Sequence, residues 1–149
     1  MRQNFEPAVE IVIGLEGKPV IDEGGLTVWG LAQKFNPEVS LDMSIDEAKV
    51  IYLNKYWMPS GCDTAPFPLD ICLFDARVNP QDDPGIPGGS MQELLNQHPE
   101  NWQDYLFFRM QRYNRCSKPK YLKGHINRIL KLHQEIKKLT ARSYNENHH

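Results

Sequence analysis

Three residues within the first thirty positions could carry acid chemistry. Glu16 follows an apolar run and stands directly before a glycine-rich segment that contains Asp22 and Thr27. Because Ile13 and Leu15 lie beside it, we expect the Glu16 carboxyl to be partly desolvated, which favours its protonated form. A protonated carboxyl can donate to a leaving group, while Asp22 or Thr27 could hold water or stabilise a developing positive charge. Hydrolysis of a glycoside needs such a layout.

The elements that must position these residues begin with a helix. Apolar side chains recur with helical spacing as far as Glu16, so a helix should start near Pro7 and end there. Residues 17–27 are rich in glycine and proline and predict a turn or small hairpin. A short helix is then expected from Trp29 to Phe35.

Further helices are predicted along the rest of the chain. Ser44 and Glu47 form a capping-box pattern, which opens a helix that runs to about Trp57. The most apolar stretch, residues 69–78, predicts a central buried helix. A loop over 81–89 and helices over about 90–96, 102–115 and 121–139 follow, the last with an inward face of Leu122, Ile126, Ile129, Leu130, Leu132 and Ile136. The fold class is therefore mainly α.

Composition limits the possible classes of protein. With 149 residues, 40% hydrophobic and 24% charged, the chain fits one globular domain. No apolar run approaches the about 20 residues that cross a bilayer, and the N-terminal stretch lacks a secretory signal pattern. The three cysteines are far apart, which favours reduced thiols and synthesis in the cytoplasm. No spacing indicates a metal site or a phosphate-binding loop, so no cofactor is expected.

Charge is divided unevenly along the chain. Residues 1–108 hold 6 of the 17 basic residues and 17 of the 19 acids, a net charge of −11, whereas residues 109–149 carry +9. Such a basic end often meets a polyanion such as nucleic acid, a lipid surface or an anionic cell wall. A solvated basic helix that complements the acidic body is the structural alternative.

Three segments together resemble glycoside hydrolase family 108, the lysozyme-like muramidases common in phages and prophages. The segment LEGKPVIDEGGLTVWGLA (15–32) is similar to the N-terminal signature of that family, although Lys18 and Glu23 replace a glycine and a proline. IYLNKYWMPSGCDTAPFPLDICLFDARVNP (51–80) resembles its Tyr-Trp helix end, Cys-Asp loop and central helix. RMQRYNRCSKPKYLKGHINRI (109–129) is similar to the end of the peptidoglycan-binding region that usually follows, here truncated.

The resemblance implies a fold and an organisation. It implies a lysozyme-like catalytic region over residues 1–80, with a small glycine-rich turn or hairpin after the first helix. A helical C-terminal region over 81–142 should pack on it, and residues 143–149 should form a frayed tail. The expected partners are peptidoglycan glycan strands, with no nucleic acid, no membrane span and a monomeric state. After synthesis without a signal peptide, such an enzyme would reach the wall through a holin or a secretion apparatus.

The resemblance also implies roles for residues. Glu16 would be the catalytic proton donor that cleaves the β-1,4 bond between N-acetylmuramic acid and N-acetylglucosamine, with Asp22 and Thr27 positioning water or substrate. Candidates for substrate binding are Trp29, Tyr56 and Trp57, by stacking on sugars or else as core, and Asp75 and Asn79, by lining a cleft or else as a buried network. Candidates for a basic surface facing the wall are Arg109, Arg112, Arg115, Lys118, Lys120, Lys123 and Arg128.

Two alternatives stay open. A lytic transglycosylase needs only one acid/base group and releases an anhydro-sugar, so it suits a site whose second carboxylate is in doubt. A catalytically inactive basic module on the same fold, bound to cell wall or nucleic acid, is the alternative from another class. Binding to nucleic acid would weaken steeply with salt, and the acidic part of the chain would oppose it.

Overall fold

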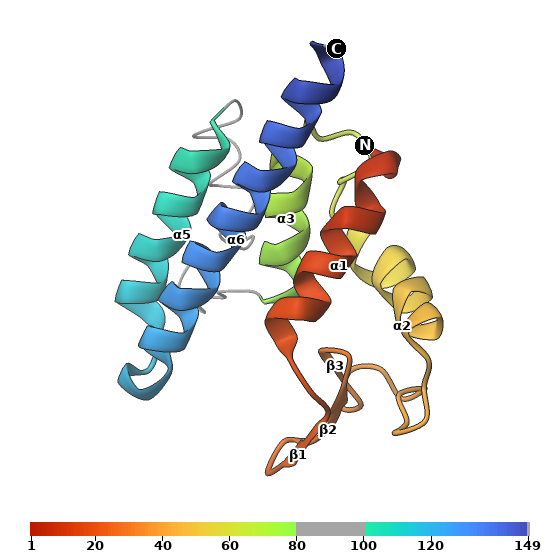
Figure 1. Ribbon diagram of the computed structural model, residues 1–149. Coiled ribbons are helices and arrows are strands. Elements are labelled where there is room, and N and C mark those ends of the chain that lie inside the picture. Colours follow the sequence, from red (N-terminus) through yellow and green to blue (C-terminus); the bar gives the residue numbers. More distant parts are fainter. Residues whose placement is uncertain (80–100, 149) are drawn as a thin grey trace.

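The computed structural model describes residues 1–79 and 101–148, apart from the side chain of Cys116. Helices pack around a central one, and a small sheet lies at one end (Figure 1). The loop and helix predicted over 81–96 lie outside the described residues. The elements are η1 (Arg2–Asn4), α1 (Phe5–Glu16), β1 (Val20–Asp22), β2 (Gly25–Val28), β3 (Leu31–Ala32), α2 (Ile45–Tyr52), η2 (Leu53–Trp57), α3 (Leu69–Val78), α5 (Trp102–Cys116) and α6 (Pro119–Asn147).

The first helix is the one predicted, starting two residues earlier. Pro7 lies in its first turn, where a missing backbone N–H removes no helical hydrogen bond. The helix ends at Glu16 because Gly17 takes a φ of 79°, outside the helical range. Its buried stripe consists of Phe5, Ala8, Val9, Val12 and Ile13.

A three-stranded antiparallel sheet follows, in the order β1-β2-β3. Strands β1 and β2 form the hairpin predicted over residues 17–27, with Val20 opposite Thr27 and Asp22 opposite Gly25. The side chain of Asp22 is exposed and accepts a hydrogen bond from the backbone N–H of Gly24 at 2.8 Å. This contact stabilises the turn.

The prediction of a short helix from Trp29 to Phe35 is wrong. Val28 pairs with Leu31 across β2 and β3, so Trp29 and Gly30 form a two-residue turn. Both have positive φ, 52° and 80°, as a tight hairpin turn requires. Two successive residues in that conformation cannot belong to a right-handed helix.

The capping box is confirmed. The backbone N–H of Glu47 donates to the side-chain oxygen of Ser44 at 3.1 Å, and α2 begins at the next residue after Ser44. Beyond Tyr52 the chain continues as η2, a π-helical turn that ends at Trp57. The helix predicted to run to about Trp57 therefore exists, with a change of hydrogen bonding in its last turn.

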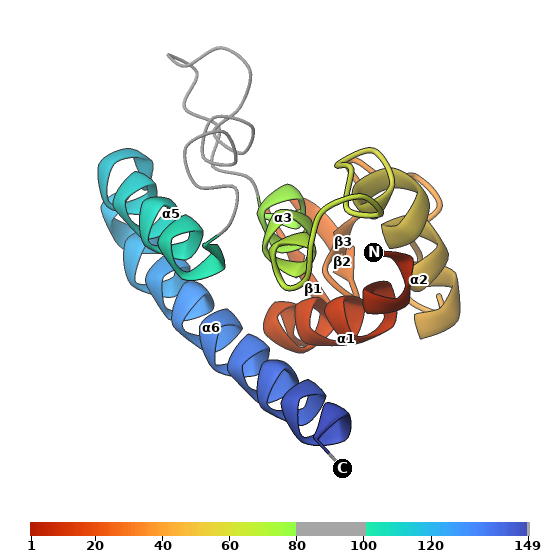
Figure 2. The same cartoon turned by 90° about the horizontal axis from the view of Figure 1, so that it is seen from above.

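The most apolar segment forms the central helix, as predicted. Every residue of α3 from Leu69 to Ala76 is buried, including Asp70 and Asp75. In both views α3 lies between α1 and α5, and it also contacts η2 (Figures 1 and 2). A buried aspartate in such a helix needs polar partners, because an unpaired charge is strongly unfavourable there.

The last two helices pack against each other (Figure 2). Helix α5 matches its prediction, whereas α6 continues to Asn147 and so includes most of the tail predicted to fray from residue 143. Ile129, Leu132 and Ile136 are buried as expected. Leu130 was predicted to face inward but is 48% exposed, because it lies about 100° around the helix from Ile129.

Helix α6 joins the two parts of the chain. It contacts both α5 and α1, and residues from all of these helices share one hydrophobic core with α3. Over residues 1–79 and 101–148, no helix combines the length and apolarity that a bilayer span requires.

Candidate active site

Glu16 lies at the C-terminal end of α1, beside the turn between β2 and β3. Its side chain is 22% exposed. A Cβ atom added to Gly30 would lie 2.4 Å from Cγ of Glu16 and 2.6 Å from the hydroxyl of Tyr52. Only glycine therefore fits at position 30, and its backbone packs directly against the Glu16 side chain.

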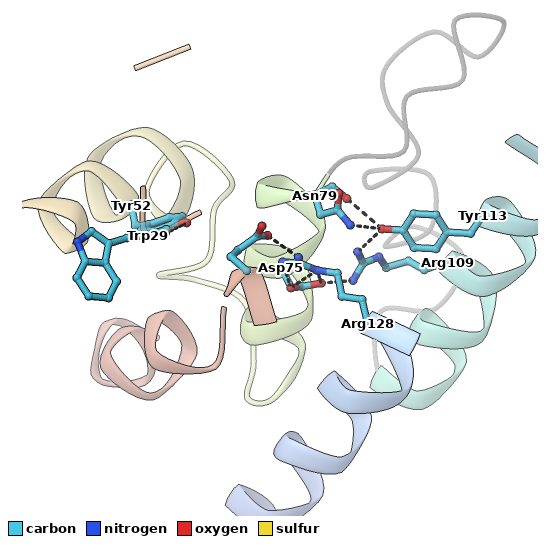
Figure 3. A network of polar contacts seen from close by, with 8 residues as sticks. Trp29, Tyr52, Asp75, Asn79, Arg109, Tyr113 and Arg128 are labelled. Carbon is cyan, nitrogen blue, oxygen red and sulfur yellow. Dashed lines mark hydrogen bonds and ion pairs between the residues drawn. The ribbon is translucent and has the colours of Figure 1, made fainter. Parts of the chain in front are cut away.

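An arginine from the far end of the chain reaches the same carboxylate. Nη1 of Arg128, on α6, donates a short hydrogen bond to Oε1 of Glu16. The same guanidinium holds Asp75 of α3, through Nη2 at 2.8 Å and Nε at 3.1 Å from Oδ1. Arg128 therefore joins two carboxylates that belong to two different helices (Figure 3).

The network continues into the core. Nη1 of Arg109, on α5, donates to Oδ2 of Asp75 at 2.8 Å, and its Nη2 donates to the hydroxyl of Tyr113 at 3.1 Å. Asn79 donates to that hydroxyl at 3.0 Å, and the hydroxyl donates to the backbone oxygen of Asn79 at 3.2 Å (Figure 3). Side chains from α1, α3, α5 and α6 are thereby linked.

Charged groups of both signs meet in this network. Among the described residues, the carboxylates of Glu16 and Asp75 face the guanidinium groups of Arg109 and Arg128. Burial alone would raise the pKa of Asp75, but the charges of Arg128 and Arg109 outweigh it and hold that pKa below its ordinary value. Burial and then the charge of Glu16 raise the pKa of Tyr52, which is therefore neutral at any physiological pH.

The environment of Glu16 differs from the expected one. The sequence predicted a carboxyl beside apolar neighbours, whereas the structure pairs it with the guanidinium of Arg128. The side chain is therefore held by an ion pair and not by an apolar wall.

Asp22 and Thr27 lie on β1 and β2. Thr27 is partly buried and Asp22 is exposed at the turn. Among the residues that the structure describes, neither hydrogen-bonds Glu16. Their roles in positioning water or substrate stay predictions.

The three aromatic candidates for substrate binding differ in how far they are buried. Trp57 cannot stack on a sugar, because it is fully buried and its Nε1 donates to Asp63 at 2.8 Å. Trp29 is partly exposed in the turn, where its Nε1 donates to the backbone oxygen of Met43 at 2.8 Å. Tyr56 is partly buried and accepts a hydrogen bond from Asn36 at 3.2 Å. Trp29 and Tyr56 therefore stay candidates for substrate binding.

Two further groups of predictions are corrected. Asp75 does not line a cleft, because it is completely buried between Arg109 and Arg128, so the alternative of a buried network holds for it. Asn79 is partly buried and hydrogen-bonds Tyr113 at the edge of the same network. Arg109 and Arg112 are buried and Arg128 is only 10% exposed, so these three contribute little to a basic surface. Arg115, Lys118, Lys120 and Lys123 are exposed.

Sequence reasoning missed the most direct neighbours of Glu16. Gly30, Tyr52 and Arg128 were not recognised as site residues. The signal that existed was Asp75, because an aspartate within an apolar helix requires a cationic partner. Which of the eleven basic residues after position 108 would supply it depends on how α5 and α6 dock.

A mainly helical domain places a partly buried glutamate at a helix end, beside a small antiparallel sheet, and this arrangement suits acid-catalysed cleavage of a glycoside. Residues 9–80 match the family model described as Glycosyl hydrolase 108. This match, over 72 of the 149 residues, supports membership of glycoside hydrolase family 108 and an activity as a glycoside hydrolase. Comparisons with curated proteins and with solved structures gave no match.

The matched region covers only part of the site. It contains α1 from residue 9 onward, the sheet, α2 and α3, and therefore Glu16 and Asp75. Arg109 and Arg128 lie beyond it, on α5 and α6. Within the described ranges, no group of three His, Cys, Asp or Glu side chains is arranged to hold a metal ion.

Proposed function

We propose that the protein is a peptidoglycan hydrolase that cleaves the β-1,4 bond between N-acetylmuramic acid and N-acetylglucosamine, with Glu16 as the general acid. The observation that carries this proposal is the position of Glu16. It is the carboxylate at the helix end beside the sheet, it stays partly exposed, and Gly30 and Arg128 fix its side chain. A general acid needs both solvent access and a defined orientation.

In the proposed reaction, protonated Glu16 donates its proton to the glycosidic oxygen. The bond between that oxygen and the anomeric carbon breaks through an oxocarbenium-like transition state. Water then adds to the anomeric carbon and releases a proton to solvent or to Glu16. As the carboxylate forms, the adjacent Arg128 stabilises its negative charge. Asp22 or Thr27 would position the attacking water.

The same proposal defines the substrate and the place where the enzyme acts. The substrate would be the glycan strands of peptidoglycan, with Trp29 and Tyr56 available to contact sugar rings. The exposed basic side chains of α5 and α6 would face the anionic wall. In a phage or prophage context, an enzyme made in the cytoplasm would reach the wall through a holin or a secretion apparatus.

A lytic transglycosylase is the second candidate, and the state of Asp75 favours it. Asp75 is fully buried and bound by two arginines, so it is not available as a second catalytic carboxylate. Asp22 is exposed on β1 and bound to its own turn. A site with one acid/base group suits a reaction in which a hydroxyl of the muramic acid itself attacks the anomeric carbon, releasing an anhydro-sugar.

The test compares the parent protein with Glu16→Gln and with Glu10→Gln. Glu10 is exposed on α1, so the control makes the same substitution on the same helix away from the site. Each protein is incubated with isolated peptidoglycan and the released fragments are identified by mass spectrometry. We expect muropeptides with reducing N-acetylmuramic acid ends from the parent and from Glu10→Gln, and none from Glu16→Gln.

Other outcomes have definite meanings. Anhydro-muropeptides from the parent would establish the transglycosylase with the same acid. Digestion by folded Glu16→Gln at the parental rate would remove Glu16 from the mechanism. No product from any of the three proteins, together with co-sedimentation with the wall, would indicate an inactive binding module.

A further inference from the structure

Arg128 of α6 touches Glu16 from a position 112 residues further along the chain. Its side chain is 10% exposed, and it lies outside residues 9–80, the part that matches the family model. The carboxylate proposed to perform the chemistry is therefore held by a side chain that the family-matched segment does not contain. The contacts that hold the Arg128 side chain in place indicate its role.

Arg128 is fixed on both sides. Nη1 points to Glu16, while Nη2 and Nε point to Asp75, so the planar guanidinium bridges the two carboxylates. Asp75 cannot turn away, because Arg109 binds its second oxygen at 2.8 Å. A guanidinium suits such a bridge because its donors have a fixed planar geometry, whereas a lysine offers a single point charge.

We propose that Arg128 is a positioning residue of the active site, through which α6 orients the Glu16 carboxylate. The inference rests on the proposed function only in taking Glu16 as the acid, because the contact itself is independent of the reaction. In this view Asp75 and Arg109 form a buried anchor that determines where Arg128 points.

Arg128→Gln should lower kcat for peptidoglycan digestion about 10- to 100-fold, because the Glu16 carboxyl is no longer oriented. Arg128→Lys keeps the positive charge but not the planar bridge to Asp75, so its kcat should also stay low. KM should change little in both variants, because the proposed role of Arg128 is to orient Glu16 and not to bind the substrate.

The experiment measures kcat and KM on soluble peptidoglycan fragments for the parent, Arg128→Gln and Arg128→Lys. Lys131→Gln is the matched control, because Lys131 is exposed on the same helix and the change of charge is equal. Carbon NMR of the Glu16 side-chain carboxyl at one fixed pH gives a readout that needs no activity. The resonance should move in Arg128→Gln and stay unchanged in Lys131→Gln.

Two results would overturn the inference. One is an unchanged resonance of the Glu16 carboxyl carbon in folded Arg128→Gln. The other, which applies even if Arg128→Gln does not fold, is a parental kcat in Arg128→Lys. A moved resonance together with full activity of Glu16→Gln would instead retain the role of Arg128 and reject the proposed function.

Discussion

Replacing Asp75 by asparagine removes the negative charge that lies between Arg109 and Arg128. Asp75 is fully buried and Arg109 is 2% exposed, so water cannot take the place of the lost charge. Taking one partner from a buried ion pair destabilises a protein by about 3–5 kcal/mol. The amide oxygen can accept from one arginine, but the amide nitrogen would then face N–H groups of the other.

The loss should be visible in thermal unfolding. For a chain of this size, each kcal/mol changes Tm by about 2–4 °C, so Asp75→Asn should lower Tm by about 6–20 °C. Glu135→Gln is the matched control, because Glu135 pairs with Lys138 at 2.9 Å but both side chains are exposed. The control has the same change of charge and should leave Tm nearly unchanged, since exposed ion pairs contribute little.

Circular dichroism of the helical signal during heating, supported by urea unfolding at 25 °C, gives both values. If Asp75→Asn and Glu135→Gln unfold at the same temperature, the buried network does not stabilise the fold, and the reasoning from burial is refuted. A large loss confined to Asp75→Asn would support it.

Two further predictions follow from the same site. The pKa of Asp75 in the folded protein lies below its ordinary value. The stability that Asp75 contributes is therefore present at pH values above the ordinary pKa and is lost as the pH falls through the folded-state pKa. Urea unfolding at a series of acidic pH values should show this loss in the parent and a weaker pH dependence in Asp75→Asn. Gly30→Ala should lower stability by about 1–3 kcal/mol and reduce peptidoglycan digestion, because its Cβ would meet Glu16. Gly25→Ala has a similarly positive φ but open space around the added Cβ, so urea unfolding and activity assays should show backbone strain without displacement of Glu16, and equal activities would contradict the proposed fit.

Local interactions explain what could be predicted from the sequence. The capping contact of Ser44 with Glu47 joins residues three apart, and the apolar run of α3 identifies a buried helix without further information. The position of Glu16 at a helix end follows from the apolar spacing before it and the glycine after it. These features depend on neighbours within a few residues, so the sequence itself carries the signal.

The errors arose where a local pattern allowed two structures. Apolar residues from Trp29 to Phe35 suggested a helix, but Gly30 permits a tight turn that pairs β2 with β3. Leu130 is apolar and adjacent to the inward stripe of α6, yet the rotation of that helix leaves it half exposed. Neither the pairing of strands nor the rotation of a helix can be derived from periodicity alone.

A mainly helical domain, an acid at the end of its first helix and a buried aspartate in its central helix could all be predicted from the order of the amino acids. The contacts by which Arg128 joins these two carboxylates and Arg109 anchors the second depend instead on how the helices pack. Many basic side chains in the last part of the chain could neutralise a buried carboxylate. The docking of α5 and α6 selects the two that turn inward, from positions 34 and 53 residues after Asp75.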